Sequence, residues 1–182
     1  VSNGVKFDYM FAYCGRFNCN LSNWDVFNVI TFRLIFNGCK EFNQDLSNWN
    51  VSNAIYFNSM FNKCLKFNSD LSKWDVSRGK YFGRMFYECK SFNADLSKWN
   101  VSNGVDFNYM FSDCILFNAD LSRWDVSNGK YFAFMFKGCK SFVADLSNWN
   151  VSNAASWKDF AKGSLLENHP ERIPERFRKD YL

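Results

Sequence analysis

The eight-residue segment 117–124, FNADLSRW, recurs along this chain at a constant spacing. Residues 92–99 carry almost the same letters 25 positions earlier. Further copies occupy residues 42–49, 67–74 and 142–149, and a more divergent copy occupies residues 17–24. A fixed period of this size predicts a solenoid, in which each unit buries its apolar face only by stacking on its neighbours.

Alignment of the units on this step places like residues in columns, and we expect about seven coils. Tryptophan, cysteine and valine each fill one column, and phenylalanine fills several others. The tryptophan column is Trp24, Trp49, Trp74, Trp99, Trp124 and Trp149; the cysteine column is Cys14, Cys39, Cys64, Cys89, Cys114 and Cys139; the valine column runs from Val1 to Val151. With 22 phenylalanines and 7 tryptophans, the chain has ample material for a continuous core.

The apolar spacing within a unit predicts one short helix and one short strand. Phe107, Met110, Phe111 and Cys114 stand at i, i+3, i+4 and i+7, which is one face of an α-helix. We therefore expect a helix at about 104–114 and at each equivalent position, with Ser102 or Asn103 as its N-cap. A strand near 120–124 would pair in parallel with its copies in adjacent coils.

The end of the chain breaks the repeat and has the composition of a terminal cap. Residues 1–160 form the predicted repeat region, and residues 161–182 form a cap of the same domain. The cap contains both prolines, many charged residues, and an apolar side that includes Ile173 and Phe177. Repeat arrays need such an end with a polar outer face.

Two further columns of side chains allow more than one interpretation. The cysteine column indicates a buried row of small apolar side chains, although disulfides between coils stay conceivable. Cys19 lies outside this column and is expected to be exposed. The acidic column would stack like charges, so its members either cap turns or hold a cation. This column is Asp45, Asp70, Asp95, Asp120 and Asp145.

Composition argues against several classes of function. The net charge of +4 is mild and scattered, which does not fit a nucleic-acid surface, and no apolar run is long enough to span a membrane. The single histidine, His169, lies in the tail, and no nucleophile–base pair is visible, so we expect no catalytic residue, no metal site and no cofactor. Because Val1 begins in the middle of a repeat unit, we expect any signal or anchor to lie upstream.

The unit Met-Phe-x-x-Cys-x-x-Phe-Asn-x-Asp-Leu-Ser-x-Trp-Asp/Asn-Val-Ser-Asn is long and specific, and residues 110–128 carry it. It resembles the 25/26-residue repeat of bacterial surface proteins and mycoplasma-type lipoproteins, which is grouped with BspA-like leucine-rich-repeat proteins. Gly104 and Phe107 depart from the usual family unit, which continues Val-Thr-x-Met. The resemblance implies an α/β, leucine-rich-repeat-like solenoid, display on the cell surface, and binding or adhesion without catalysis.

Residues that vary between units are the candidates for contact with a ligand. Lys73, Lys98 and Arg123 form a basic row suited to an acidic glycan or a protein, unless it is only a solvated face balanced by the acidic column. Tyr56, Tyr81 and Tyr131 form an aromatic row, and Tyr and Arg are favoured at interfaces. The leading hypothesis is a surface-exposed binding or adhesion module, and the alternative is a structural stalk or spacer. We expect a monomer, or association through an exposed N-terminal coil.

Overall fold

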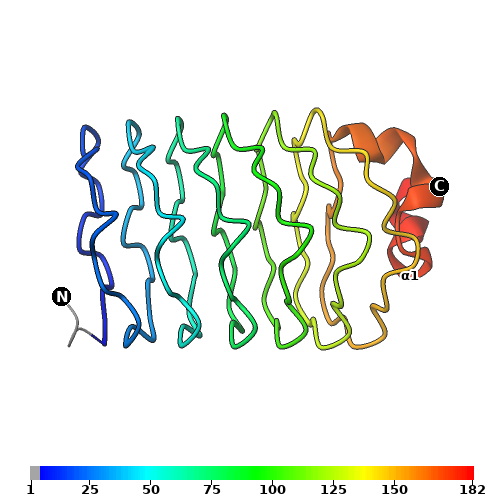
Figure 1. Ribbon diagram of the computed structural model, residues 1–182. Helices are drawn as coiled ribbons and strands as arrows, with labels where there is room; N and C mark the ends of the chain where they lie inside the picture. The colour runs from blue at the N-terminus through cyan, green and yellow to red at the C-terminus, as the bar shows by residue number, and fades with distance from the viewer. Residues whose placement is uncertain (1–4) are drawn as a thin grey trace.

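The computed structural model describes residues 5–182 of the chain. Successive coils stack side by side along one axis, with the first described coil and the C-terminus at opposite ends of the stack (Figure 1). A small group of helices closes the C-terminal end. The predicted start within a repeat unit at Val1 lies outside the described residues.

The coils are held in register by main-chain hydrogen bonds from each coil to the next. Phe57 N–H donates to the Tyr81 carbonyl at 2.8 Å, and Phe61 N–H donates to the Met85 carbonyl at 2.9 Å. One residue per coil also forms an isolated parallel bridge with its copy 25 positions on. These bridges join Lys6–Thr31, Thr31–Tyr56, Tyr56–Tyr81, Tyr81–Asp106, Asp106–Tyr131 and Tyr131–Ser156. The sequence period is therefore the step of the stack.

The predicted α/β, leucine-rich-repeat-like architecture is wrong. Among residues 5–182 the repeat units contain no helix and no extended strand, and the isolated bridges do not combine into a sheet. The helical elements all lie in the C-terminal cap: η1 (Leu165–Asn168), η2 (Pro170–Arg172), α1 (Glu175–Arg178) and η3 (Lys179–Tyr181). The coils consist of consecutive turns instead.

The predicted helix at 104–114 is a chain of turns with the same buried face. Met110 N–H donates to the Phe107 carbonyl at 3.1 Å, and Phe111 N–H donates to the next coil, at the Met135 carbonyl. Alternate amides thus bond within the coil and between coils, so the i→i−4 ladder of a helix cannot form. Phe107, Met110, Phe111 and Cys114 are nevertheless fully buried. The spacing correctly identified the inward residues but not the main-chain bonding. Ser102 and Asn103 consequently have no helix to cap.

The predicted strand at 120–124 is also wrong, since this segment consists of two tight turns. Ser122 N–H donates to the Asp120 carboxylate at 2.9 Å, and Trp124 N–H donates to the Leu121 carbonyl at 3.0 Å. The other members of the acidic column, from Asp45 to Asp145, accept the amide of the serine two residues on in the same way. The turn-capping interpretation of this column is confirmed. Within residues 5–182 no three His, Cys, Asp or Glu side chains are grouped so that they could hold a metal ion.

Two positions in every coil have a positive φ, and most are not glycine. In the fourth coil they are Arg84 (φ 57°) and Glu88 (φ 56°). Each is the third residue of a turn, as in Phe82–Met85 and Phe86–Cys89, which is where a type II turn requires positive φ. Among residues 5–182, glycine occupies this conformation only at Gly38, Gly138 and Gly163. The stacking of the coils therefore holds non-glycine residues in the left-handed backbone conformation that they ordinarily avoid.

Gly163 provides a test of this strain. A Cβ at Gly163, where φ is +69°, would meet nothing closer than Lys140 Nζ at 3.6 Å. Gly163→Ala is therefore expected to lower the free energy of unfolding by about 1–2 kcal/mol through backbone strain alone. Gly15→Ala is the matched control, because its φ is not positive and its nearest neighbour lies 3.9 Å away. We expect it to be neutral or to stabilise by about 0.4–1 kcal/mol. Denaturant titration measures both, and equal effects would contradict this explanation.

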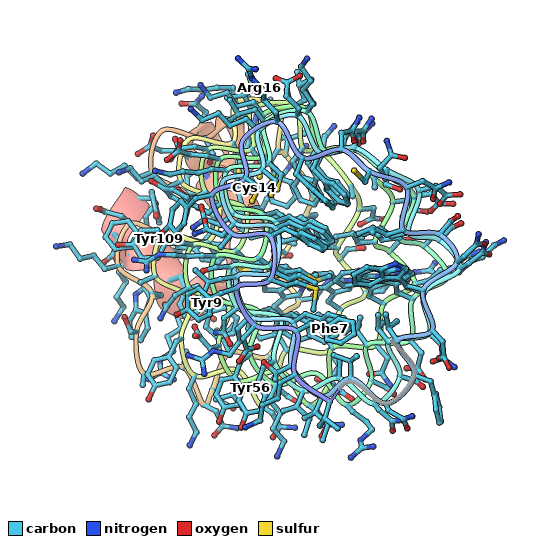
Figure 2. All side chains as sticks on the ribbon, turned by 90° about the vertical axis from the view of Figure 1, so that its left-hand side faces the viewer. Phe7, Tyr9, Cys14, Arg16, Tyr56 and Tyr109 are labelled. Atoms are coloured by element: carbon cyan, nitrogen blue, oxygen red, sulfur yellow. The ribbon has the colours of Figure 1, made fainter. Side chains whose placement is uncertain are left out.

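The interior consists of rows of aromatic rings that run along the stack. Figure 2, viewed along the axis, shows these rings in flat layers inside the coils, whereas Tyr56 and Tyr109 lie at the outer surface. The row of Phe11, Phe36, Phe61, Phe86, Phe111 and Phe136 has centroid separations of 5.6–5.8 Å. Each ring therefore packs on its own copy in the neighbouring coil, which is why every coil must repeat the same letters.

The tryptophan and cysteine rows add hydrogen bonds between coils. Trp99 Nε1–H donates to the Leu71 carbonyl at 2.9 Å, and the tryptophans from Trp49 to Trp149 all donate in this way. The thiol of Cys114 donates to the Phe86 carbonyl at 2.8 Å, and four other thiols make the equivalent bond. Each of these carbonyl groups also accepts a main-chain N–H of its own coil, so the side chains add a second hydrogen bond that joins neighbouring coils.

All seven cysteines are free thiols, so disulfides between coils are absent from this structure. Five of them are buried, as predicted, and burial raises the pKa of Cys39 to about 12. Cys14 and Cys19 are exposed. The prediction of an exposed thiol at Cys19 is confirmed, whereas Cys14 departs from its column because it belongs to the first coil.

The cap covers the last coil with apolar side chains and hydrogen-bond acceptors, as a further coil would. Leu166, Ile173 and Phe177 are fully buried, and the Phe177 ring packs on Trp157 at 5.1 Å. Ala161 N–H donates to the Tyr181 hydroxyl, and Gly163 N–H donates to Glu167, both at 2.7 Å. In earlier coils the amides at these positions donate to main-chain carbonyls. Side-chain oxygens of the cap therefore take the place of the main-chain carbonyls that accept these amides in earlier coils.

Candidate binding groove

An open groove of about 500 Å³ lies on the outer side of the coils. It runs along the stack across four of them. One wall is the row Tyr56, Tyr81 and Asp106; the other wall is the row Leu34, Ser59, Arg84 and Tyr109; between the rows lie Arg33, Asn58, Gly83 and Asn108. We call this feature the groove. Every residue in it occupies a position at which the repeat varies.

The first wall is aromatic over two coils and acidic in the third. The rings of Tyr56 and Tyr81 stack in parallel, with centroids 5.0 Å apart and an interplanar angle of 2°. Both tyrosines are half-buried. Asp106 takes the next place in this row, so the shorter carboxylate follows directly after the aromatic pair. The wall therefore offers apolar surface and a hydrogen-bond acceptor side by side.

The second wall presents a guanidinium group on an aromatic platform. Arg84 lies over the ring of Tyr109, with its Cζ atom 4.7 Å from the ring centroid. Tyr109 in turn stacks on Phe134 at 4.5 Å. This arrangement orients the Arg84 side chain while its N–H donors stay available, because cation–π contacts use only the flat face of the guanidinium.

The carboxylate of Asp106 covers residue 83 at the centre of the groove, which requires a glycine at that position. A Cβ at Gly83 would lie 2.7 Å from Asp106 Oδ2, so any larger residue would displace that carboxylate. Asp106 Oδ1 accepts the Asn108 N–H at 3.0 Å, which fixes the side chain over the glycine. Burial raises the pKa of Asp106, and the Asn108 amide and the nearby Arg84 only partly offset this effect.

The raised pKa predicts that Asp106 destabilises the folded chain near neutral pH. Between its ordinary pKa of 3.8 and its folded pKa, the folded state binds more protons, so stability falls as pH rises through this window. Asp106→Asn keeps an acceptor for Asn108 and removes the buried charge. We expect a higher thermal midpoint at pH 7 and a difference that disappears below pH 3.8.

Asp120→Asn is the matched control, because the pKa of Asp120 is lowered in the folded state whereas that of Asp106 is raised. The hydrogen bonds from Ser122 lower the pKa of Asp120, so its charge stabilises the folded state above pH 3.8 and this contribution is lost in acid. Asp120→Asn is expected to leave the midpoint at pH 7 unchanged or lower. If both variants shifted the midpoint in the same direction, the assignment of the Asp106 effect to its buried charge would be wrong.

The structure brings two of the six predicted ligand-contacting residues into the groove, Tyr56 and Tyr81. Tyr131 continues the same row beyond Asp106 and is exposed, but it does not line the groove. Whether any of the three contacts a ligand stays a prediction.

Lys73, Lys98 and Arg123 lie in a separate row, outside the groove. All three side chains are exposed. Hydrogen bonds from the serine two residues on lower the pKa of Asp70, Asp95 and Asp120, and the basic side chain three residues on lowers it further. This arrangement favours the alternative of a solvated face with balanced charges.

Sequence reasoning missed the charged and small residues of the groove: Arg33, Asn58, Gly83, Arg84, Asp106 and Asn108. The signal in the sequence was that the positions flanking the phenylalanine column, such as Asn58, Gly83 and Asp106, vary in size and charge from one unit to the next. Asn58, Gly83 and Asn108 occupy one such column. Variation marks a surface position, but the repeat alone does not show that small residues in one row lie between larger residues in two others.

Comparisons with known proteins place the chain among repeat proteins of mycoplasma type. Residues 1–86 and 80–170 match the family described as "Mycoplasma protein of unknown function, DUF285". No curated protein matches the chain. In the part of the chain that the structure describes, no helix is long and apolar enough to cross a membrane.

Proposed function

We propose that this chain, which belongs to the family described as Mycoplasma protein of unknown function, DUF285, is a non-catalytic binding module. The observation that carries the proposal is the groove itself. The core consists of the same residues in every coil, whereas the groove combines two arginines, three tyrosines and one half-buried carboxylate at variable positions. Function in a repeat protein is expected where units differ, because identical positions are needed for stacking.

Display on a cell surface is part of the same proposal. It is supported by the resemblance of the repeat to those of mycoplasma-type lipoproteins and BspA-like surface proteins. Only the resemblance of the repeat sequence supports this location, because the coils do not have the leucine-rich-repeat geometry that the resemblance implied. Labelling of intact cells with a biotin reagent that does not cross membranes tests the location: the protein should be labelled before lysis.

Binding through the groove can be tested on arrays of glycans and proteins. The double variant Tyr81→Ala/Arg84→Ala is expected to lose at least tenfold in affinity, because buried aromatic and arginine contacts often contribute more than about 1 kcal/mol each. Lys98→Ala/Arg123→Ala is the matched control, which also removes two exposed side chains, and it should bind like the parent protein. Binding that survives in the groove variant, or that is lost only in the control, would contradict the proposal, as would an absence of binding to every array.

The alternative function is a structural spacer, which the continuous ladders of identical inter-coil bonds favour. The two functions predict different results from the same arrays, because a spacer has no groove-dependent ligand.

A further inference from the structure

The chemistry of the groove narrows the class of ligand, provided that the proposed binding function holds. Arg33 and Arg84 are both exposed, and neither guanidinium has an ion pair or hydrogen bond to another described residue. Some other arginines in the chain do have partners: Arg172 and Arg176, for example, donate to main-chain carbonyls of Val143 and Ser152. The two groove arginines are thus available for an anionic group, which a guanidinium binds with two parallel N–H donors.

The main chain along the groove is already paired, which argues against an extended peptide. Leu34 N–H donates to the Asn58 carbonyl at 3.0 Å, and Ser59 N–H donates to the Gly83 carbonyl at 2.9 Å. Arg84 N–H donates to the Asn108 carbonyl at 2.8 Å. A peptide that adds to a sheet edge needs a row of unpaired amides and carbonyls. Recognition in the groove must therefore depend on side chains.

The side chains that remain are of the kinds that hold a sugar ring. The stacked pair Tyr56 and Tyr81 supplies apolar surface along one wall, against which the C–H groups of a pyranose can pack. The amide of Asn58 and the carboxylate of Asp106 lie beside that surface and have two polar atoms each, which matches a pair of neighbouring hydroxyls. The 5.0 Å separation of the tyrosine rings is comparable with the length of one sugar unit, so successive coils can hold successive units.

We propose that the groove binds a linear acidic glycan along the axis of the stack. Its carboxylate groups pair with Arg33 and Arg84, and its rings lie against Tyr56 and Tyr81. The proposal rests on the binding function above and adds the ligand class, namely a carboxylate-bearing polysaccharide.

Isothermal titration with defined oligosaccharides tests the ligand class. The probes are oligogalacturonate and a hyaluronan oligosaccharide, with fully methyl-esterified oligogalacturonate and oligoglutamate as comparisons. We expect the acidic sugars to bind at least tenfold more tightly than the ester or the peptide. Affinity should fall as salt is raised, because the charges that pair lie at an exposed surface. Arg84→Gln and Tyr81→Ala should each weaken binding at least tenfold, whereas Lys98→Gln should not change it.

Asp106→Asn provides a variant that should gain affinity. It removes a negative charge beside the bound carboxylates, so we expect binding of the acidic sugars to tighten severalfold. Thermal midpoints of all variants, measured without ligand, show that each is folded.

The possible failures are distinguishable. Preference for oligoglutamate or the methyl ester, with loss in the groove variants, would overturn the acidic glycan but leave the binding function. No binding of either acidic sugar would likewise overturn the ligand class. Binding of any probe that the groove variants do not alter would overturn both proposals.

Discussion

Trp99→Ala is expected to lower the free energy of unfolding by about 3–5 kcal/mol, as large-to-small changes of a buried aromatic do. The Trp99 ring is almost completely buried, and it stacks between Trp74 and Trp124 at 6.4 Å from each. Its Nε1–H also satisfies the Leu71 carbonyl. Alanine would remove both neighbours' contacts and one of the two hydrogen bonds to that carbonyl, which keeps the Trp74 N–H. Chemical denaturation followed by circular dichroism measures the loss.

Two further variants separate the contribution of the Trp99 hydrogen bond from that of ring stacking between coils. Trp99→Phe keeps an aromatic ring in the row but removes the indole hydrogen bond to Leu71, so the loss should be about 0.5–1.5 kcal/mol. Trp24→Ala removes a half-buried member of the same row in the first coil, and its cost should be clearly smaller. If Trp24→Ala and Trp99→Ala cost the same, stacking between coils would not be the source of the stability.

Phe177→Ala is the second large effect, because this residue closes the C-terminal end of the core. Its fully buried ring contacts Phe132, Trp157 and Phe160, with centroid separations of 5.1–5.6 Å. We expect a loss of about 3–5 kcal/mol. Detachment of the cap would also expose the apolar end of the stack, so the variant should self-associate in size-exclusion chromatography with light scattering.

Tyr181→Phe is the matched control within the same cap. The Tyr181 hydroxyl accepts the buried Ala161 N–H, and burial raises the pKa of this tyrosine to about 12, so the hydroxyl stays neutral at physiological pH. Phenylalanine keeps the ring and leaves one amide unsatisfied, at a cost of about 1–3 kcal/mol. This variant should stay monomeric. Self-association of Tyr181→Phe but not of Phe177→Ala would contradict the role assigned to the apolar contact.

Particular residues show how far the sequence could be interpreted. The spacing of Phe107, Met110, Phe111 and Cys114 correctly predicted four inward-facing side chains, and the acidic column was correctly interpreted as a set of turn caps. The helix itself was wrong because consecutive turns place the same residues inward. The groove could be predicted only in part from the sequence: Tyr56 and Tyr81 were identified as candidate contacts, but Arg84 and Asp106 were not.

The sequence by itself determined the step of the stack and the rows of residues within it. The same letter every 25 residues brings like side chains together, and apolar letters must face the core. Only the tertiary structure decided which main-chain groups pair. A helix of 8–11 residues is marginal by itself, whereas each neighbouring coil offers a carbonyl to every second amide. The same stacking makes the left-handed turns tolerable and places variable residues such as Arg84 and Asp106 around Gly83, where they form the groove.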